Sequence, residues 1–131
     1  MDYFLGVDIG TTSVKVVAFN NSGEVICKHS VTSEMQHPQP AYSEQNSDAI
    51  FNAVVLSINK VVDDLLPANA VLVSFSAMLH SLIAVDEEGK PLTACIIWAD
   101  NRAGAIAEDL RKTGANVKFL SIEPLLGRLK S

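Results

Sequence analysis

The sequence predicts a domain of the mixed α/β class, and three observations lead to this prediction. Three short runs rich in β-branched residues open the chain and are joined by turns. A stretch with helical periodicity follows, between Ser47 and Pro67. A short run that is apolar on both faces, residues 71–75, comes directly after that helix. Strands before and after a helix in this order are typical of a mixed sheet with helices packed on it.

The composition supports one ordinary folded domain. The 131 residues are 48% hydrophobic and 19% charged, which excludes a disordered chain and allows a real core. A net charge of −5 argues against a nucleic-acid partner, and no apolar run is long enough for a membrane helix. The start of the chain lacks the basic segment of a signal peptide. Cys27 and Cys95 lie in apolar segments without CxxC spacing, so we expect buried, reduced thiols in a cytoplasmic protein.

The amino-terminal third predicts three antiparallel strands. Residues 3–8 form an apolar run that stops at Gly10, and residues 14–19 form a second one. A polar turn at residues 20–23 leads to a third run at residues 24–31. Short β-branched runs joined by Asn/Gly turns indicate hairpins. A polar segment with Pro38 and Pro40 then predicts a surface loop.

A helix is predicted from Ser47 onward. Its apolar face is formed by residues at spacings of four, four, three and four: Ile50, Val54, Ile58, Val61 and Leu65. Asn46 or Ser47 can cap the first turn, and Asp48 suits the positive end of the helix dipole. Pro67 prevents the helix from continuing.

The remaining elements alternate between strands and helices. Residues 71–75 are expected to form a central strand covered on both faces, and residues 81–85 and 93–98 two strands around a solvated turn. A second helix is expected after Asp100, with Gly114 as its stop and four residues facing inward: Ala103, Ile106, Ala107 and Leu110. A last helix is expected from Pro124, with these residues inward: Leu125, Leu126 and Leu129. Because this last helix would be apolar, we expect it to pack on a neighbouring part of the protein that residues 1–131 do not include.

The segment of residues 6–15 carries the strongest functional signal. A strand delivers Asp8, and a tight turn at Gly10 lets the backbone approach a ligand. The next residues offer backbone N–H groups and hydroxyls, which suit an anion: Thr11, Thr12 and Ser13. Asp8 would repel a phosphate unless Mg²⁺ lay between them, and Lys15 could add a positive charge. The alternative is a plain hairpin turn without a ligand. The segment is not a Walker A loop, because the GxxxxGK(S/T) spacing is absent.

Residues 8–15 resemble the first phosphate motif of the sugar kinase, Hsp70 and actin superfamily, whose domains have a ribonuclease H-like core. Three further segments resemble one branch of it, the FGGY carbohydrate kinases: Tyr42-Ser43-Glu44-Gln45, Ser76-Ala77-Met78-Leu79-His80-Ser81 and Trp98-Ala99-Asp100-Asn101-Arg102. Within this family, residues 74–83 followed by residues 98–102 are most similar to gluconate kinases. The resemblance covers residues 4–114 in the right order and implies a truncated ribonuclease H-like mixed sheet with flanking helices.

The resemblance also implies an activity. Residues 1–131 would be the N-terminal part of the first, sugar-binding domain of a kinase, without the second, nucleotide domain. The kinase would transfer the γ-phosphoryl group of ATP to a sugar or sugar acid, with gluconate as the first candidate. Asp8 would bind Mg²⁺ and orient the phosphate, and the catalytic base would lie beyond Ser131. The nucleotide phosphates would bind to five residues: Gly10, Thr11, Thr12, Ser13 and Lys15. We therefore expect the chain alone to be catalytically incomplete.

The resemblance places the substrate near five further residues: Leu79, His80, Trp98, Asp100 and Arg102. His80 follows the end of a predicted strand, where ligands of α/β sheets collect, but Leu79 stands where the family usually has Met. Each of these has a structural alternative. His80 could be a partly buried histidine that bonds a backbone carbonyl, Trp98 could fill the core, and Asp100 could cap a helix while Arg102 forms an ion pair. We expect residues 44–45 to anchor a loop.

Three classes of function remain open at this stage. The first is a part of a carbohydrate kinase that acts on gluconate or, alternatively, on a pentulose, a hexulose or glycerol. The second is an Hsp70-like or actin-like ATPase, which would share the phosphate loop alone. The third is a non-catalytic module whose apolar tail pairs with itself or with a partner. The expected partners are a sugar or sugar acid, the rest of the kinase chain and, in a homo-oligomer, a second copy; no membrane partner is expected.

Overall fold

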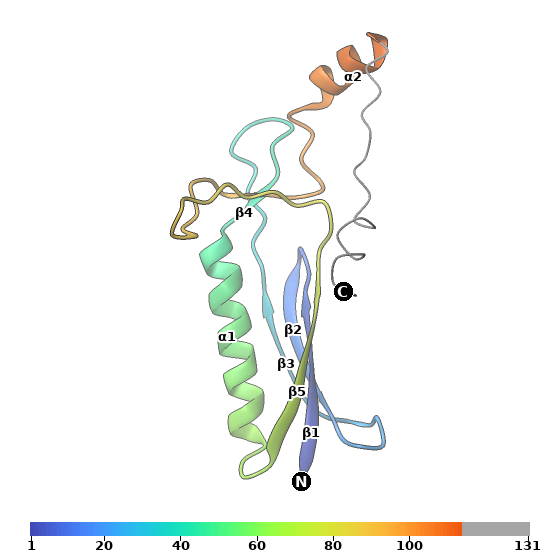
Figure 1. Cartoon of the computed structure of the whole chain (residues 1–131), viewed down its shortest axis with the longest axis vertical. Coiled ribbons are helices and arrows are strands. Elements are labelled where there is room, and N and C mark those ends of the chain that lie inside the picture. The colour runs from blue at the N-terminus through green and yellow to red at the C-terminus, as the bar shows by residue number, and fades with distance from the viewer. Residues whose placement is uncertain (114–131) are drawn as a thin grey trace, which may run out of the picture. The chain divides into compact units, whose positions relative to one another are not determined.

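A four-stranded sheet with the strand order β3-β2-β1-β5 organises the computed structural model, which describes residues 1–113 (Figure 1). The first three strands, β1 (Asp2–Ile9), β2 (Ser13–Phe19) and β3 (Val25–Thr32), are antiparallel neighbours. β5 (Asn69–Ala77) pairs with β1 in parallel. These strands confirm the three predicted antiparallel strands and the mixed α/β class.

The helix α1 (Ser47–Asp64) connects the antiparallel part of the sheet to β5. Asn46 is its N-cap, and the side-chain oxygen accepts a hydrogen bond from the N–H of Ala49 at 2.9 Å. The helix ends before Pro67, as predicted. A parallel strand pair needs a crossover of this kind, because β5 must start at the same end of the sheet as β1.

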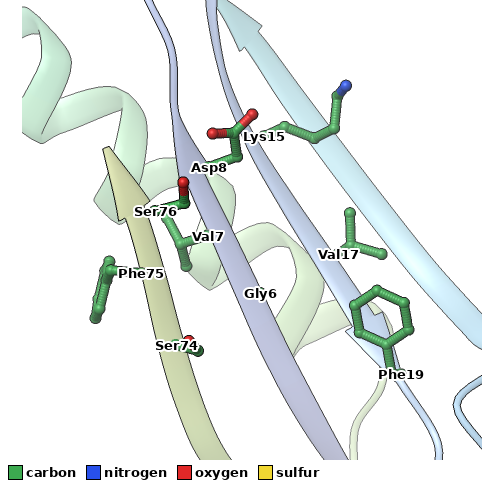
Figure 2. A pocket seen from close by; sticks show the side chains of 9 residues that line it. All are labelled: Gly6, Val7, Asp8, Lys15, Val17, Phe19, Ser74, Phe75 and Ser76. Atoms are coloured by element: carbon green, nitrogen blue, oxygen red, sulfur yellow. The ribbon is translucent and has the colours of Figure 1, made fainter. Parts of the chain in front are cut away.

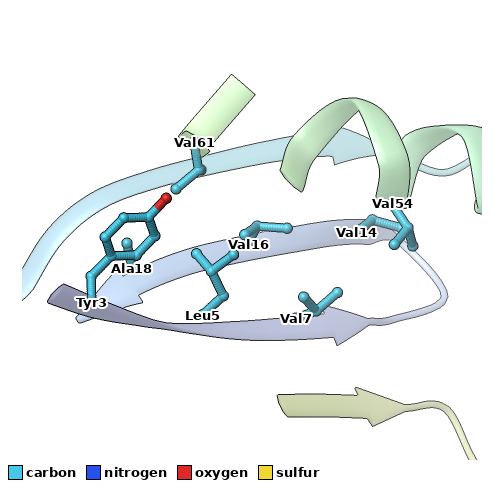
Figure 3. Packing of buried hydrophobic residues seen from close by; sticks show 8 residues of the cluster. All are labelled: Tyr3, Leu5, Val7, Val14, Val16, Ala18, Val54 and Val61. Atoms are coloured by element: carbon cyan, nitrogen blue, oxygen red, sulfur yellow. The ribbon is translucent and has the colours of Figure 1, made fainter. Parts of the chain in front are cut away.

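One face of the sheet packs on α1 and forms the core (Figure 3). The strand residues of this core alternate along β1 and β2 and meet two valines of α1: Tyr3, Leu5, Val7, Val14, Val16, Ala18, Val54 and Val61. The remaining residues of the predicted helix face are partly buried against this cluster: Ile50, Ile58 and Leu65. Alternating strand residues share a face, so the opposite face of β1 and β2 carries the residues between them, including Asp8 and Lys15.

The prediction that residues 71–75 form a covered central strand is wrong for this chain. β5 is an edge strand, and each of its residues is exposed, including Phe75 at 61%. The pattern of apolar residues on both faces is real, but α1 packs mainly on β2 and β3. Within residues 1–113, β1 is the only hydrogen-bonded neighbour of β5.

The predicted hairpin of residues 81–98 is present only in part. β6 (Cys95–Ile96) pairs with β4 (Glu44–Gln45) in a small second sheet, and residues 81–85 contribute only single bridges, such as Leu82 with Ile96. The side chain of Thr93 accepts the N–H of Ala84 at 3.1 Å, so a side chain takes the place of a ladder carbonyl there. The solvated turn itself is confirmed by the Asp86 N–H to Lys90 carbonyl hydrogen bond of 2.9 Å.

Residues 102–113 belong to a second compact unit and are described by themselves. They contain α2 (Gly104–Lys112), which confirms a helix after Asp100. The expected inward face is not buried, because Ile106 and Leu110 are exposed. An amphipathic pattern marks a face suited to burial, and a helix of nine residues cannot bury that face by itself. Gly114 and the predicted helix from Pro124 lie outside the described residues.

Cys27 and Cys95 are free thiols and are half-buried, not fully buried as predicted. Burial raises the pKa of the Cys95 thiol, which keeps it protonated at neutral pH. Within residues 1–113, no helix combines the length and apolar character required to cross a membrane.

Candidate functional site

Three hydrogen bonds hold the turn between β1 and β2, one within the turn and two from other segments. The N–H of Gly10 donates to the Ser13 carbonyl at 3.0 Å. The Thr11 carbonyl accepts from the Gln45 side chain at 2.7 Å, and the Thr12 carbonyl accepts from the N–H of Ser33 at 2.9 Å. A Cβ atom at Gly10 would lie only 3.1 Å from the Ser13 carbonyl, so the turn is too tight for a larger residue without a shift. This explains why glycine suits the position.

Asp8 lies on the sheet face opposite α1, and its residue is exposed. The strand register sets it directly between Lys15 on β2 and Ser76 on β5. Residues directly opposite one another on paired strands share a face, so the carboxylate has an ammonium group on one side and a hydroxyl on the other (Figure 2). Neither Asp8 nor Lys15 forms an ion pair within the part of the chain that the structure describes. These polar groups therefore face an open surface.

Two hollows adjoin Asp8. One, of about 250 Å³, runs over the sheet face and is lined by Asp8, Lys15 and Ser76 together with apolar neighbours (Figure 2). The other, of about 460 Å³, lies at the ends of β1 and β5. Residues from three of the four sequence motifs line this second hollow: Asp8, Gly10, Thr11, Leu79, His80 and Trp98. We call it the motif hollow.

His80 reaches the motif hollow because the chain after β5 stays beside the end of β1. The N–H of Met78 donates to the Ile9 carbonyl at 3.0 Å, which extends the β1–β5 pairing beyond β5. His80 itself has a φ angle of 58°, a left-handed conformation that residues other than glycine rarely adopt. It is exposed and makes no hydrogen bond within residues 1–113, unlike the partly buried histidine of the structural alternative.

Trp98 is 61% exposed and lines the motif hollow, so the alternative in which it fills the core is wrong. The preceding residue, Ile97, is the buried one. Its N–H donates to the Ser43 carbonyl at 3.2 Å, which fixes the start of the Trp98 segment to the segment of residues 42–45. Exposed aromatic rings beside polar groups are suited to the apolar faces of a sugar.

Asp100 is not among the residues that line the motif hollow. One oxygen of the Asp100 carboxylate accepts the N–H of Ser43 at 2.7 Å, so Asp100 binds the segment of residues 42–45. It does not cap α2, since the N-cap is Ala103 and no side chain bonds there. Arg102 lies in the second unit. A substrate role for these two residues stays a prediction.

The remaining site residues lie along the same strand and turn. Thr12 and Ser13 follow Thr11 in the chain and lead into β2. Lys15 lines the hollow on the sheet face. Gln45 is confirmed as a loop anchor, because its side chain bonds the Thr11 carbonyl. Sequence reasoning missed the position of Ser76 beside Asp8, although the residue belongs to a quoted motif; the strand register alone reveals it.

The donor set fits Mg²⁺ bound together with a phosphate. Within residues 1–113 no group of three or more His, Cys, Asp or Glu residues could hold a metal ion. A single exposed carboxylate, Asp8, stands beside a turn rich in hydrogen-bond donors. Mg²⁺ takes one or two carboxylates and completes its shell with water and phosphate oxygens, so this arrangement suits it and does not suit a structural zinc ion.

Comparison with known proteins gives consistent matches. Residues 3–126 match the family model described as the N-terminal domain of the FGGY family of carbohydrate kinases. A gluconokinase of Bacillus licheniformis is 44% identical over 117 residues, which are 88% of this chain and 23% of that protein. Two solved structures from Lactobacillus acidophilus are similar in fold at 29% identity. They are a ligand-bound xylulose kinase, with a TM-score of 0.83 over 87% of this chain and 23% of that one, and a gluconate kinase, with a TM-score of 0.82 over 86% and 23%.

Proposed function

Since the chain belongs to the FGGY family of carbohydrate kinases, we propose that it forms the first part of the sugar-binding domain of a gluconate kinase. The chain spans about a quarter of the length of the relatives it matches. The kinase transfers the γ-phosphoryl group of ATP to a hydroxyl of gluconate. The observation that carries this proposal is the motif hollow, where Asp8 and the turn at Gly10 and Thr11 meet His80 and Trp98.

The phosphate end of the hollow neutralises negative charge. The turn supplies backbone N–H groups and threonine hydroxyls, and Lys15 adds a positive charge on the next strand. Asp8 would hold Mg²⁺, which when bound draws charge from the phosphate oxygens and so stabilises the transition state. We assign Asp8 the role of a metal ligand and not that of the base that removes the proton of the sugar hydroxyl.

The sugar end of the hollow orients the acceptor. A neutral His80 offers one hydrogen-bond donor and one acceptor, which suits a polyhydroxy substrate. Trp98 and Leu79 line the same hollow and provide apolar surface for the substrate. Held in this way, the acceptor hydroxyl lies near the phosphate turn, and such proximity lowers the entropic part of the barrier.

The remaining parts of the kinase are proposed to lie in sequence that this chain does not contain. We propose that these parts are the nucleotide domain and the base. The isolated chain is therefore expected to bind ligands without turning over ATP and sugar. The free thiols of Cys27 and Cys95 favour a reducing compartment, and we propose the cytoplasm.

Gluconate is favoured over other sugars by the similarity to a gluconokinase at 44% identity. An anionic substrate also favours a cationic neighbour, and Lys15 and Arg102 are the cations within the four motifs. Xylulose is the second candidate because a xylulose kinase shares the fold at a similar TM-score. An Hsp70-like or actin-like ATPase is set aside, because the match to the FGGY family covers residues 3–126.

The sugar assignment is tested by titrating gluconate, xylulose and glycerol into the chain and measuring the heat of binding. We expect gluconate to bind best, and His80→Ala to weaken its binding by about tenfold, which corresponds to one or two lost hydrogen bonds. His37→Ala is the matched control, because His37 is exposed, does not line the motif hollow and bonds the Tyr42 carbonyl at 2.9 Å. Equal gluconate affinity in the wild type and His80→Ala would contradict the assignment. Tighter binding of xylulose than of gluconate would make xylulose the proposed substrate.

The exposed strand β5 is proposed to be covered by the rest of the kinase. In the isolated chain a second copy takes that place, because an apolar edge strand pairs readily with another strand. We expect sedimentation of the chain to show association that grows with concentration. Val73→Lys, on β5, should reduce this association, whereas Val25→Lys on the opposite edge strand β3 should leave it unchanged. A strict monomer at every concentration would contradict the prediction.

A further inference from the structure

We propose that Gln45 is a positioning residue for the phosphate turn: its side chain holds the Thr11 carbonyl and so turns the Thr12 N–H toward a bound polyphosphate. The inference rests on the proposed function, because the polyphosphate is that of the nucleotide. Gln45 is 1% exposed and lies on β4, far along the sequence from the turn that it contacts. Its amide nitrogen lies 2.7 Å from the Thr11 carbonyl oxygen and 3.4 Å from that of Glu34.

The orientation of the Gln45 amide follows from its partners. Both are backbone carbonyl oxygens, which only accept hydrogen bonds, so the NH₂ end of the amide must face them. The other end, Oε1, is buried and has no hydrogen-bond partner among the described residues. A buried amide with an unsatisfied oxygen destabilises the fold by roughly 1–3 kcal/mol relative to a satisfied one. An apolar residue would avoid this cost, so the contact with Thr11 is the feature that favours glutamine here.

Peptide geometry carries the effect of Gln45 to the other side of the turn. The bond between Thr11 and Thr12 is trans and planar, so the Thr12 N–H points opposite to the Thr11 carbonyl. With that carbonyl held by Gln45, the Thr12 N–H is directed away from the interior. The N–H groups of Thr11 and Thr12 donate to no acceptor within residues 1–113, whereas the Gly10 N–H is used inside the turn. They are the donors available to an anion.

Gln45 also connects this turn to the sugar end of the motif hollow. Its backbone pairs with Cys95 on β6, and β6 leads through Ile97 to Trp98. The backbone pairing does not depend on the side chain. A substitution at Gln45 can therefore release the turn while leaving the Trp98 segment in place, which separates a positioning role from a general structural one.

The test uses ¹H–¹⁵N NMR of the chain, with Mg²⁺–tripolyphosphate as the probe. Gln45→Met keeps the length of the side chain and removes its donor. We expect the free variant to show shifted and faster-exchanging amide signals at Thr11 and Thr12, about tenfold weaker tripolyphosphate binding and unchanged gluconate affinity. Gln39→Met, an exposed glutamine of the loop, is the matched control and should change neither affinity. Equal loss of both affinities would indicate only a structural role and overturn the inference.

A measurement on the wild type covers the case in which Gln45→Met does not fold. Tripolyphosphate should shift the side-chain NH₂ signals of Gln45 together with the Thr11 and Thr12 amides, while the NH₂ signals of Gln39 stay in place. An unmoved Gln45 signal during saturable binding would overturn the inference and leave the proposed function intact. If the wild type binds no tripolyphosphate, the proposed function fails. In that case the Thr12 amide signal of Gln45→Met without ligand, where this variant folds, still shows whether Gln45 positions the turn.

Discussion

Asp8→Asn is expected to change polyphosphate binding in opposite directions with and without Mg²⁺. In the presence of Mg²⁺ the variant should bind tripolyphosphate at least about 10–100-fold more weakly, because the protein loses its carboxylate ligand to the metal. Without Mg²⁺ it should bind about tenfold more tightly. The wild-type carboxylate then lies beside the anion with no cation between them, and that repulsion is worth about 1–4 kcal/mol at 4 Å.

The matched control for this experiment is Asp2→Asn. Asp2 lies at the other end of β1, is exposed like Asp8, and the change removes the same charge from the chain. It should have little effect under either condition, because a charge about 20 Å away along a strand is screened at ordinary ionic strength. Titration calorimetry with and without Mg²⁺ measures the affinity of the wild type and of each variant under both conditions. A weakening by Asp8→Asn in both conditions would mean that Asp8 supports the turn and does not bind the metal.

Leu5→Ala is expected to produce the largest loss of stability, about 3–4 kcal/mol in the free energy of unfolding. Leu5 is 2% exposed and lies in the core cluster between β1 and α1 (Figure 3). Removing its side chain leaves a cavity in the core that α1 covers. Since domains of this size are stable by about 5–15 kcal/mol, the change removes a large part of the total.

Leu56→Ala makes the same chemical change at an exposed site and serves as the control. Leu56 lies on α1 and is 55% exposed, so its replacement should change stability by less than about 0.5 kcal/mol. Urea unfolding followed by circular dichroism gives both values. Similar losses in the two variants would show that the apolar cluster on β1 is not the stabilising core of the chain.

Much of the fold could be predicted from sequence because its signals are local. The three opening strands are marked by β-branched runs and Asn/Gly turns, and α1 by its apolar period, its cap at Asn46 and Pro67. The family match confirms the predicted superfamily fold, a ribonuclease H-like mixed sheet with flanking helices. The place of β5 could not be predicted, because an apolar run is the same whether a covering element lies on it or not.

The residues of the candidate site also divide into those that the sequence alone brings together and those that the tertiary structure brings together. Asp8, Gly10 and Thr11 are neighbours in the chain, so their joint presence at one turn is a local property. That His80 and Trp98 line the same hollow depends on pairings between distant residues. Met78 bonds Ile9, and Ile97 bonds Ser43, and neither contact leaves a periodic signal in the sequence.

The sequence by itself determined the tight turn at Gly10, the opening strands, α1 and the family, because each depends on residue types at short or fixed spacings. Only the tertiary structure decided that Gln45 holds the turn, that Ser76 stands beside Asp8, and that Asp100 bonds Ser43. The physical reason is the separation along the sequence over which each kind of interaction acts. Propensities and caps act within a few residues, whereas hydrogen bonds across strands depend on a register that the whole core establishes.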